Sequence, residues 1–199
     1  MDKSKIDSSV ENKPKLRIHL DFGDNSLYDL GYLSIDIYQL IVFSRLIEDN
    51  DRHSLEKYFY GSRRSFMLTR NSSILKKYRN SANVEHMEDG SIVIDIAQVG
   101  LVATIIVPFV AMYVQEQIKK YSEEVTFEIN SQDKQLQKII EEVGQGYFGL
   151  EDEGLKWLLN MLENRGYSIE VINKDVYRIN KVMTNYQRRI VRTIKKYIK

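Results

Sequence analysis

The sequence predicts an α+β fold in which a mixed sheet is packed with helices around one central apolar helix. Three short segments, 16–22, 92–96 and 125–129, alternate apolar and polar residues as half-buried strands do. Segments with helical spacing lie between them, an order typical of α+β architectures. The chain has 199 residues, 43% hydrophobic and 29% charged, which is enough apolar material to bury a core and typical of a globular protein.

The first half begins with a polar segment, residues 1–14, that we expect to be disordered. Residues 15–22 form the first predicted strand. Apolar residues then recur at helical spacing over 34–47, with Ser34 as the expected N-cap. A shorter helix is expected at 54–60.

Residues 61–90 give a weaker signal, with a possible strand at 65–69 and either a short helix or a strand at 73–79. The signal sharpens after residue 90, where 92–96 reads as a strand. A long apolar helix is then predicted over 99–121 and a further strand over 125–129.

The last third of the chain is predicted to be mainly helical. Helices are predicted at 131–143 and 151–165, with Gly166 as a left-handed C-cap. Residues 167–172 and 176–179 are then expected to pair as a hairpin. A final helix spans 181–199. These elements divide the chain into a core domain at 15–130 and a C-terminal helix–hairpin–helix subdomain at 131–199.

Charge is sorted into blocks along the chain. Residues 57–84 carry seven basic side chains and no acidic one, and residues 174–199 carry nine basic and one acidic, although the whole chain has a net charge of only +1. Blocks of one sign attract phosphates, acidic lipids or acidic protein surfaces whatever the total charge. Residues 85–173 are acidic, so they offer an internal neighbour that would neutralise the basic blocks instead.

The final helix is amphipathic. On a helical wheel its apolar stripe consists of Met183, Tyr186, Ile190, Ile194 and Tyr197. Cations lie on the opposite side: Lys181, Arg188, Arg192, Lys195 and Lys199. This pattern fits a terminal helix that docks on the core and leaves its basic side in solvent. It also fits binding to a nucleic-acid backbone, to an acidic protein or to an anionic membrane surface.

The first basic block adds a second set of candidate cations, interleaved with aromatic residues. The candidates are Arg63, Arg64, Arg70, Lys76, Lys77 and Arg79. Arginine and aromatic side chains together hold phosphates and stack on bases, as in proteins that bind single strands. The alternative is that the aromatic residues belong to the core and the cations cover an acidic neighbour within the same protein.

No catalytic or metal-binding constellation is recognisable, and we expect neither a cofactor, a metal nor an enzymatic activity. The chain has no cysteine, which excludes disulfides, thiolate zinc sites and iron–sulfur clusters, and only three histidines. The segment 144–149 matches G-x-G-x-x-G but follows a predicted helix, whereas dinucleotide sites follow a strand. The rival enzyme hypothesis requires His19, Asp21 and Asp24 to converge in a cleft.

Residues 92–114 raise the alternative of a single-pass membrane anchor. Their uncharged part, 99–114, is shorter than the ~20 residues that a bilayer requires, so a buried core helix is the favoured interpretation. The N-terminal residues are polar and lack the apolar region of a secretion signal, so a cytoplasmic location is expected.

These observations predict a non-enzymatic binding or regulatory protein that acts through its basic surfaces on nucleic acid. The alternative is an adaptor or inhibitor that binds an acidic protein, and self-association stays open. The many isoleucine, lysine, asparagine and tyrosine residues are typical of a low-GC bacterium, or of its phages and plasmids. The order of predicted elements over 15–121 is similar to small proteins of bacterial mobile elements and defence loci, a resemblance that assigns no activity.

Overall fold

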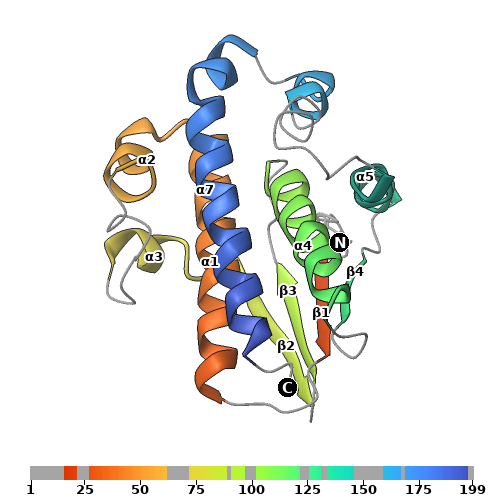
Figure 1. Cartoon of the computed structure of the whole chain (residues 1–199). Helices are drawn as coiled ribbons and strands as arrows, with labels where there is room; N and C mark the ends of the chain where they lie inside the picture. Colours follow the sequence, from red (N-terminus) through yellow and green to blue (C-terminus); the bar gives the residue numbers. More distant parts are fainter. Residues whose placement is uncertain are drawn as a thin grey trace, which may run out of the picture.

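The structure is a computed structural model, and its helices and strands are shown in Figure 1. It describes residues 16–21, 27–61, 72–88, 91–96, 102–121, 126–130, 134–145, 159–166 and 169–196. The elements in chain order are β1 (Leu16–Asp21), α1 (Leu27–Glu48), α2 (Arg52–Tyr58), α3 (Ser73–Lys77), β2 (Asn83–Glu88), β3 (Ser91–Ile96), α4 (Ala103–Lys119), β4 (Thr126–Asn130), α5 (Lys134–Gln145) and α7 (Ile169–Lys195). Residues 159–164 are also helical.

Helix α1 lies at the centre of the helical part of the fold. It contacts α7, α4, α2 and α3, and it runs antiparallel to α7, which lies against it (Figure 1). Because neighbours surround it, α1 is buried on most of its circumference, with Leu40, Val42, Phe43 and Leu46 all inaccessible to solvent or nearly so. The predicted centre was the apolar helix at 99–121. Helix α4 forms most of this segment and contacts α7, α5, α1 and β4, so α4 and α1 share the central place.

The four strands form one sheet in the order β2-β3-β1-β4, and every pairing is antiparallel. In the register of β1, Ile18 pairs with Ile94 of β3 and with Ile129 of β4. The alternating apolar positions of the three strands are therefore direct neighbours on one face of the sheet. Between β2 and β3 the register shifts at Val84 and His86, which is an irregularity of the β-bulge type.

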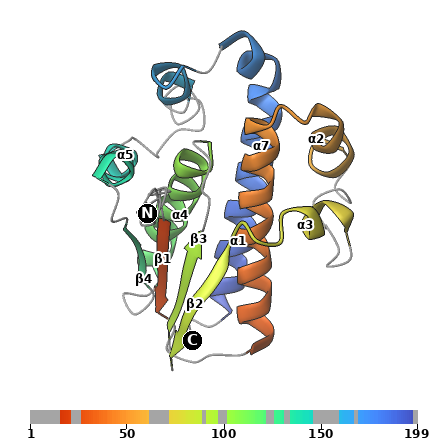
Figure 2. The same ribbon diagram turned by 180° about the vertical axis from the view of Figure 1, so that it is seen from behind.

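Helix α4 connects the sheet to the helices. It contacts β4, α5, α1 and α7, and it lies in front of β1 in Figure 1 and behind β1 in the reverse view of Figure 2. Its residues from Ile105 to Val110 are buried, as are Val114 and Ile118. Pro108 lies inside the helix and removes one backbone hydrogen bond. Among the described residues, no helix combines the length and apolar character needed to cross a bilayer.

The predicted α+β class with a mixed sheet is wrong. Most of the described residues are helical, and the four short strands pair only antiparallel, without any parallel pairing. The helical share exceeds the prediction because α1 begins at Leu27 and α7 at Ile169, well before the predicted starts of these helices. The protein is a predominantly helical fold that carries one small antiparallel sheet.

The predicted C-terminal hairpin is also wrong. Residues 169–195 form the single helix α7, so the expected turn at 173–175 lies inside it. The physical reason is that Val176, Ile179 and Met183 follow the helical spacing of the stripe in the last helix, and this longer pattern outweighs the local turn residues. The predicted boundary at residue 130 stays a prediction, but residues from both sides of it share one hydrophobic core.

Several predicted ends and caps are resolved. Ser34 is not an N-cap, because it lies inside α1. Helix α2 is capped by Asp51, whose Oδ1 accepts a hydrogen bond from the Ser54 backbone N–H at 3.0 Å. Gly166 has a φ of 82°, as predicted for a left-handed C-cap. The expected disordered segment 1–14 and the possible strand 65–69 lie outside the described residues.

A proline substitution tests whether residue 174 lies in a helix or in a turn. We expect Lys174→Pro to lower the free energy of unfolding by about 3 kcal/mol or more, because proline removes a hydrogen bond and clashes inside a helix. Lys174→Ala is the control and leaves the helix intact. The measurement is urea unfolding of both variants. Equal stability of the two would contradict a continuous α7.

Candidate functional site

Helix α7 is fixed to α1 by two polar contacts, each made with a buried side chain of α1. The carboxylate of Asp36, only 2% exposed, forms an ion pair with the guanidinium of Arg189. One turn away, the hydroxyl of Tyr186 donates a hydrogen bond to Oε1 of Gln39 at 2.9 Å, and both residues are buried. These contacts join positions three residues apart on each helix. They therefore set the rotation and the register of α7 on the core.

Burial raises the pKa of an ionisable group in each of the two contacts, with different consequences. Desolvation raises the pKa of Asp36 from 3.8 to about 6, although the charge and the hydrogen bond of Arg189 act to lower it. Desolvation also raises the pKa of the Tyr186 hydroxyl, which keeps this group protonated as a hydrogen-bond donor. The ion pair is thus the pH-sensitive contact of the two.

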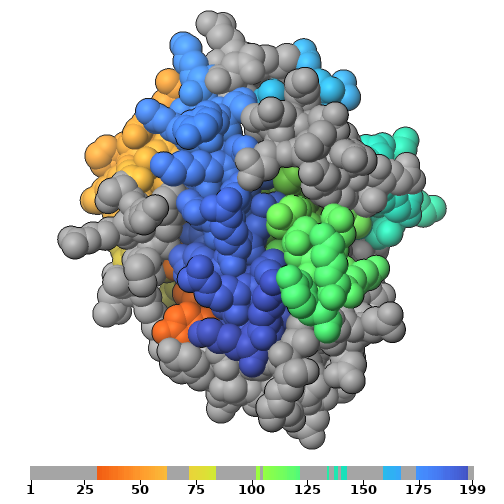
Figure 3. Space-filling view, viewed as in Figure 1, coloured from red at the N-terminus to blue at the C-terminus, as the bar shows by residue number. Residues whose placement is uncertain are grey.

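The opposite side of α7 carries a row of cations, which we call the α7 basic face. Its members are all exposed: Lys174, Lys181, Arg188, Arg192 and Lys195. Four of them recur at every seventh position, so all five lie within an arc of about 60° and extend over about 31 Å of helix. The space-filling view shows α7 as a band of surface atoms beside α4 (Figure 3).

Ion pairing distinguishes this face from two other arginines of α7, Arg178 and Arg189. Arg178 of α7 pairs with Glu56 and, at 3.8 Å, with Asp175, and Arg189 pairs with Asp36. Among the described residues, no carboxylate lies within ion-pair distance of the five cations of the α7 basic face. The internal acidic neighbour that would neutralise them is therefore not found in the described part of the chain.

Two exposed tyrosines accompany the α7 basic face. Tyr177 is 77% exposed and lies on the same arc, between Lys174 and Lys181. At the other end of the face, Tyr121 follows α4 and is 58% exposed. The Nζ atom of Lys195 lies 3.7 Å from the centroid of the Tyr121 ring. A hydrogen bond from Lys195 and the positive charge of Lys195 lower the pKa of the Tyr121 hydroxyl. Flat aromatic surface and positive charge therefore lie together at both ends.

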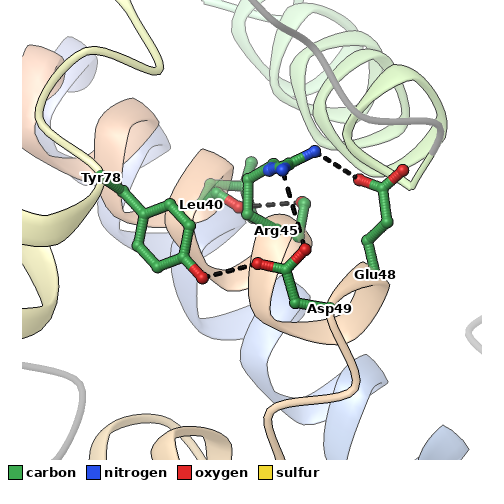
Figure 4. A network of polar contacts seen from close by, with 6 residues as sticks. Leu40, Arg45, Glu48, Asp49 and Tyr78 are labelled. Atoms are coloured by element: carbon green, nitrogen blue, oxygen red, sulfur yellow. Dashed lines mark hydrogen bonds and ion pairs between the residues drawn. The ribbon is translucent and has the colours of Figure 1, made fainter.

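The second group of predicted cations lies on and after α3. Lys76, Lys77 and Arg79 are exposed. The segment is anchored to the end of α1 by Tyr78, whose hydroxyl donates to Oδ2 of Asp49 at 2.7 Å. Figure 4 shows this contact and the neighbouring pairs of Arg45 with Glu48 and Asp49. The three cations are thus held at the surface by a fixed segment.

The structure does not bring the two predicted groups together on one element. α3 contacts α1, on the side away from α4, whereas α7 contacts both α1 and α4 (Figures 1 and 2). Four predicted residues, Arg63, Arg64, Arg70 and Lys199, lie outside the described residues. The other seven are all exposed, four on α7 and three on or after α3.

Sequence reasoning missed three cations that lie on the α7 basic face or at the adjoining end of α4. Lys174 was assigned to a turn, although its spacing of seven residues from Lys181 was a readable signal once a single helix was considered. Lys119 and Lys120 are exposed at the end of α4, directly before Tyr121. No sequence signal indicated that the end of α4 lies beside the end of α7, because this proximity depends on tertiary packing.

The residues of the rival enzyme hypothesis are only partly described. His19 and Asp21 lie in β1, and Asp24 lies outside the described residues, so the absence of an activity stays a prediction. Within the described ranges, no three side chains of the metal-binding types form a group that would hold a metal ion.

Comparison with known proteins adds no functional assignment. No protein-family model matches the chain, and no match is found among curated proteins or among solved structures.

The pH dependence of stability tests the environment of Asp36. The unfolded state loses the Asp36 proton near pH 4, but the folded state keeps it up to about pH 6. The raised pKa of Asp36 therefore stabilises the folded state fully below pH 4, and this stabilisation is lost as the pH rises through about 6. We expect Asp36→Asn to lack this fall, as measured by urea unfolding across this pH range. Parallel pH profiles of the two proteins would contradict the assignment.

Proposed function

We propose that this protein is a non-enzymatic, cytoplasmic nucleic-acid-binding protein of a bacterial mobile element, phage or defence locus, and that it binds through the α7 basic face. One observation carries the proposal: the five exposed cations in a row, which have no carboxylate partner among the described residues. Charges that serve the fold itself are paired in this protein, as Arg178 and Arg189 are. Cations without an internal carboxylate partner are available to an external anion.

The dimensions of the face support a phosphate backbone as that anion. Its length of about 31 Å equals the axial rise of about nine nucleotides of one strand in duplex DNA, at 3.4 Å per nucleotide. Lysine and arginine side chains are long enough to contact successive phosphates from one straight helix. Binding of this kind releases counterions, so it requires no apolar patch on the protein.

The exposed tyrosines support single strands over duplexes. Unstacked bases pack on aromatic rings, and this contact contributes about 1–3 kcal/mol per base. Tyr177 and Tyr121 offer such rings at the two ends of the α7 basic face, with Lys195 beside the second. The centres of protein–protein interfaces are poor in lysine, and three of the five cations are lysines, which disfavours an acidic protein as the partner.

Salt dependence is the first test. With five phosphate contacts, the affinity for a single strand should fall about 130-fold from about 50 to about 200 mM salt, following a slope of about −3.5. In Arg188→Gln/Arg192→Gln/Lys195→Gln the slope should be shallower by about 2, because three contacts are lost. The measurement is fluorescence anisotropy of a labelled oligothymidylate over a salt series.

The matched control removes three exposed cations from other elements, in Arg52→Gln/Lys134→Gln/Lys138→Gln. Its charge change is the same, so its slope should stay at the wild-type value. If both triple variants reduce the slope equally, the effect is one of net charge and the α7 basic face is not the binding site. A saturable, salt-tolerant complex with a protein from the cognate cell extract, without nucleic-acid binding, would favour the acidic-partner alternative.

Stacking on Tyr177 is the second test. We expect Tyr177→Ala to weaken single-strand binding by about 1–3 kcal/mol and to leave duplex binding nearly unchanged, because paired bases are not free to stack on the ring. Tyr32→Ala, at an exposed tyrosine of α1, is the control and should leave both affinities at wild-type values. An equal loss for single strands and duplexes would contradict base stacking.

A further inference from the structure

A cavity lies between α1, α3 and the start of β2, and none of the described residues of α7 lines it. Its volume is about 340 Å³, which is in the range of small-molecule sites, about 300–1,000 Å³. On the α1 side it is lined by Ile37, Tyr38 and Ile41, and on the opposite side by Leu75 and Ala82. The body of the cavity is therefore apolar.

The walls of the cavity are fixed before any ligand enters. The hydroxyl of Tyr38 donates to the backbone carbonyl of Leu75 at 2.6 Å and joins α1 to α3 across the cavity wall. The hydroxyl of Tyr78 binds Asp49 and anchors the residues that follow α3 (Figure 4). The donor proton of the Tyr38 hydroxyl is therefore already engaged within the protein. A preformed cavity reduces the entropy lost on binding.

In the described part of the chain, both charged residues of the lining are positive. Lys76 and Arg79 line the cavity, and both are exposed, so they lie where it meets solvent. Among the described residues, no carboxylate contributes to the lining and none lies within ion-pair distance of either cation. An apolar body with two adjacent cations is complementary to an amphipathic anion.

We propose that this cavity binds a small amphipathic carboxylate, an aliphatic or aromatic acid. Its apolar body lies against Ile37, Ile41 and Leu75, and its carboxylate lies between Lys76 and Arg79. Both cations donate charge-assisted hydrogen bonds to a carboxylate, and the arginine does so with two parallel N–H groups. This site is separate from the α7 basic face and does not depend on the proposed function.

Isothermal titration calorimetry with octanoate as the probe tests the site. We expect saturable binding of octanoate to the wild-type protein and weaker binding of octanol, which has the same chain without the charge. In Lys76→Gln/Arg79→Gln the octanoate affinity should fall about tenfold or more, because both charged partners are lost. Lys77→Gln removes a charge from the same helix at a residue that does not line the cavity, so it should bind octanoate as the wild type does.

A second variant tests the apolar body without altering charge. Ala82→Leu places a larger side chain in the cavity, so both octanoate and octanol should bind more weakly, with thermal unfolding confirming that the variant is folded. The proposal is overturned if octanoate does not bind the wild-type protein, or if octanol binds equally well. It is also overturned if Lys77→Gln loses as much affinity as the double variant, or if folded Ala82→Leu keeps wild-type affinity for octanoate.

Discussion

The contact between α1 and α7 is the interaction on which the rest of the fold depends. Helix α1 is surrounded by other elements, yet its buried surface includes the charged Asp36 and the polar Gln39. A buried carboxylate without a partner would be strongly destabilising. Arg189 and Tyr186 supply the partners from the far end of the sequence. The central helix can therefore be buried only when α7 is in place, which ties the folding of the first half of the chain to the last 30 residues.

Helix α7 consequently has two chemically different sides. One side supplies apolar residues such as Ile190 and Ile194 to the core, together with the two polar partners of α1. The other side presents the α7 basic face to solvent. Because Arg188 and Arg189 are adjacent, they lie about 100° apart on the helix. Arg188 is exposed, whereas Arg189 forms the ion pair with the buried Asp36. The two neighbouring arginines therefore have different roles.

The sequence was most informative where a pattern is regular and least informative where tertiary contacts decide. Strands β1, β3 and β4 lie near the alternating segments, but β2 was not recognised, because its irregularity at Val84 and His86 breaks the period of two. The long helices were truncated in the prediction, since Ser34 and the turn residues at 173–175 were given more weight than the continuing helical spacing.

The candidate site divides in the same way. The helical wheel correctly separated the exposed Lys181, Arg188, Arg192 and Lys195 from the buried stripe, because amphipathic periodicity is a local property. It could not reveal that Tyr121 lies beside Lys195, or that Lys76 and Arg79 line a cavity with α1. Those relations join residues far apart in the chain, and no periodicity encodes them.

The two polar contacts between α1 and α7 also fix how the two helices are aligned along their axes. They join residues three positions apart on each of two antiparallel helices, so only one alignment satisfies both. A slip of one helical turn, about 5.4 Å, would leave all four groups mismatched. The cations of α7 are therefore held at a fixed spacing along the helix and in a fixed orientation relative to α4. A single-residue insertion after Arg189 would rotate the following cations by about 100° around the helix axis. The length of this segment should therefore be under stricter constraint than the identity of its exposed residues.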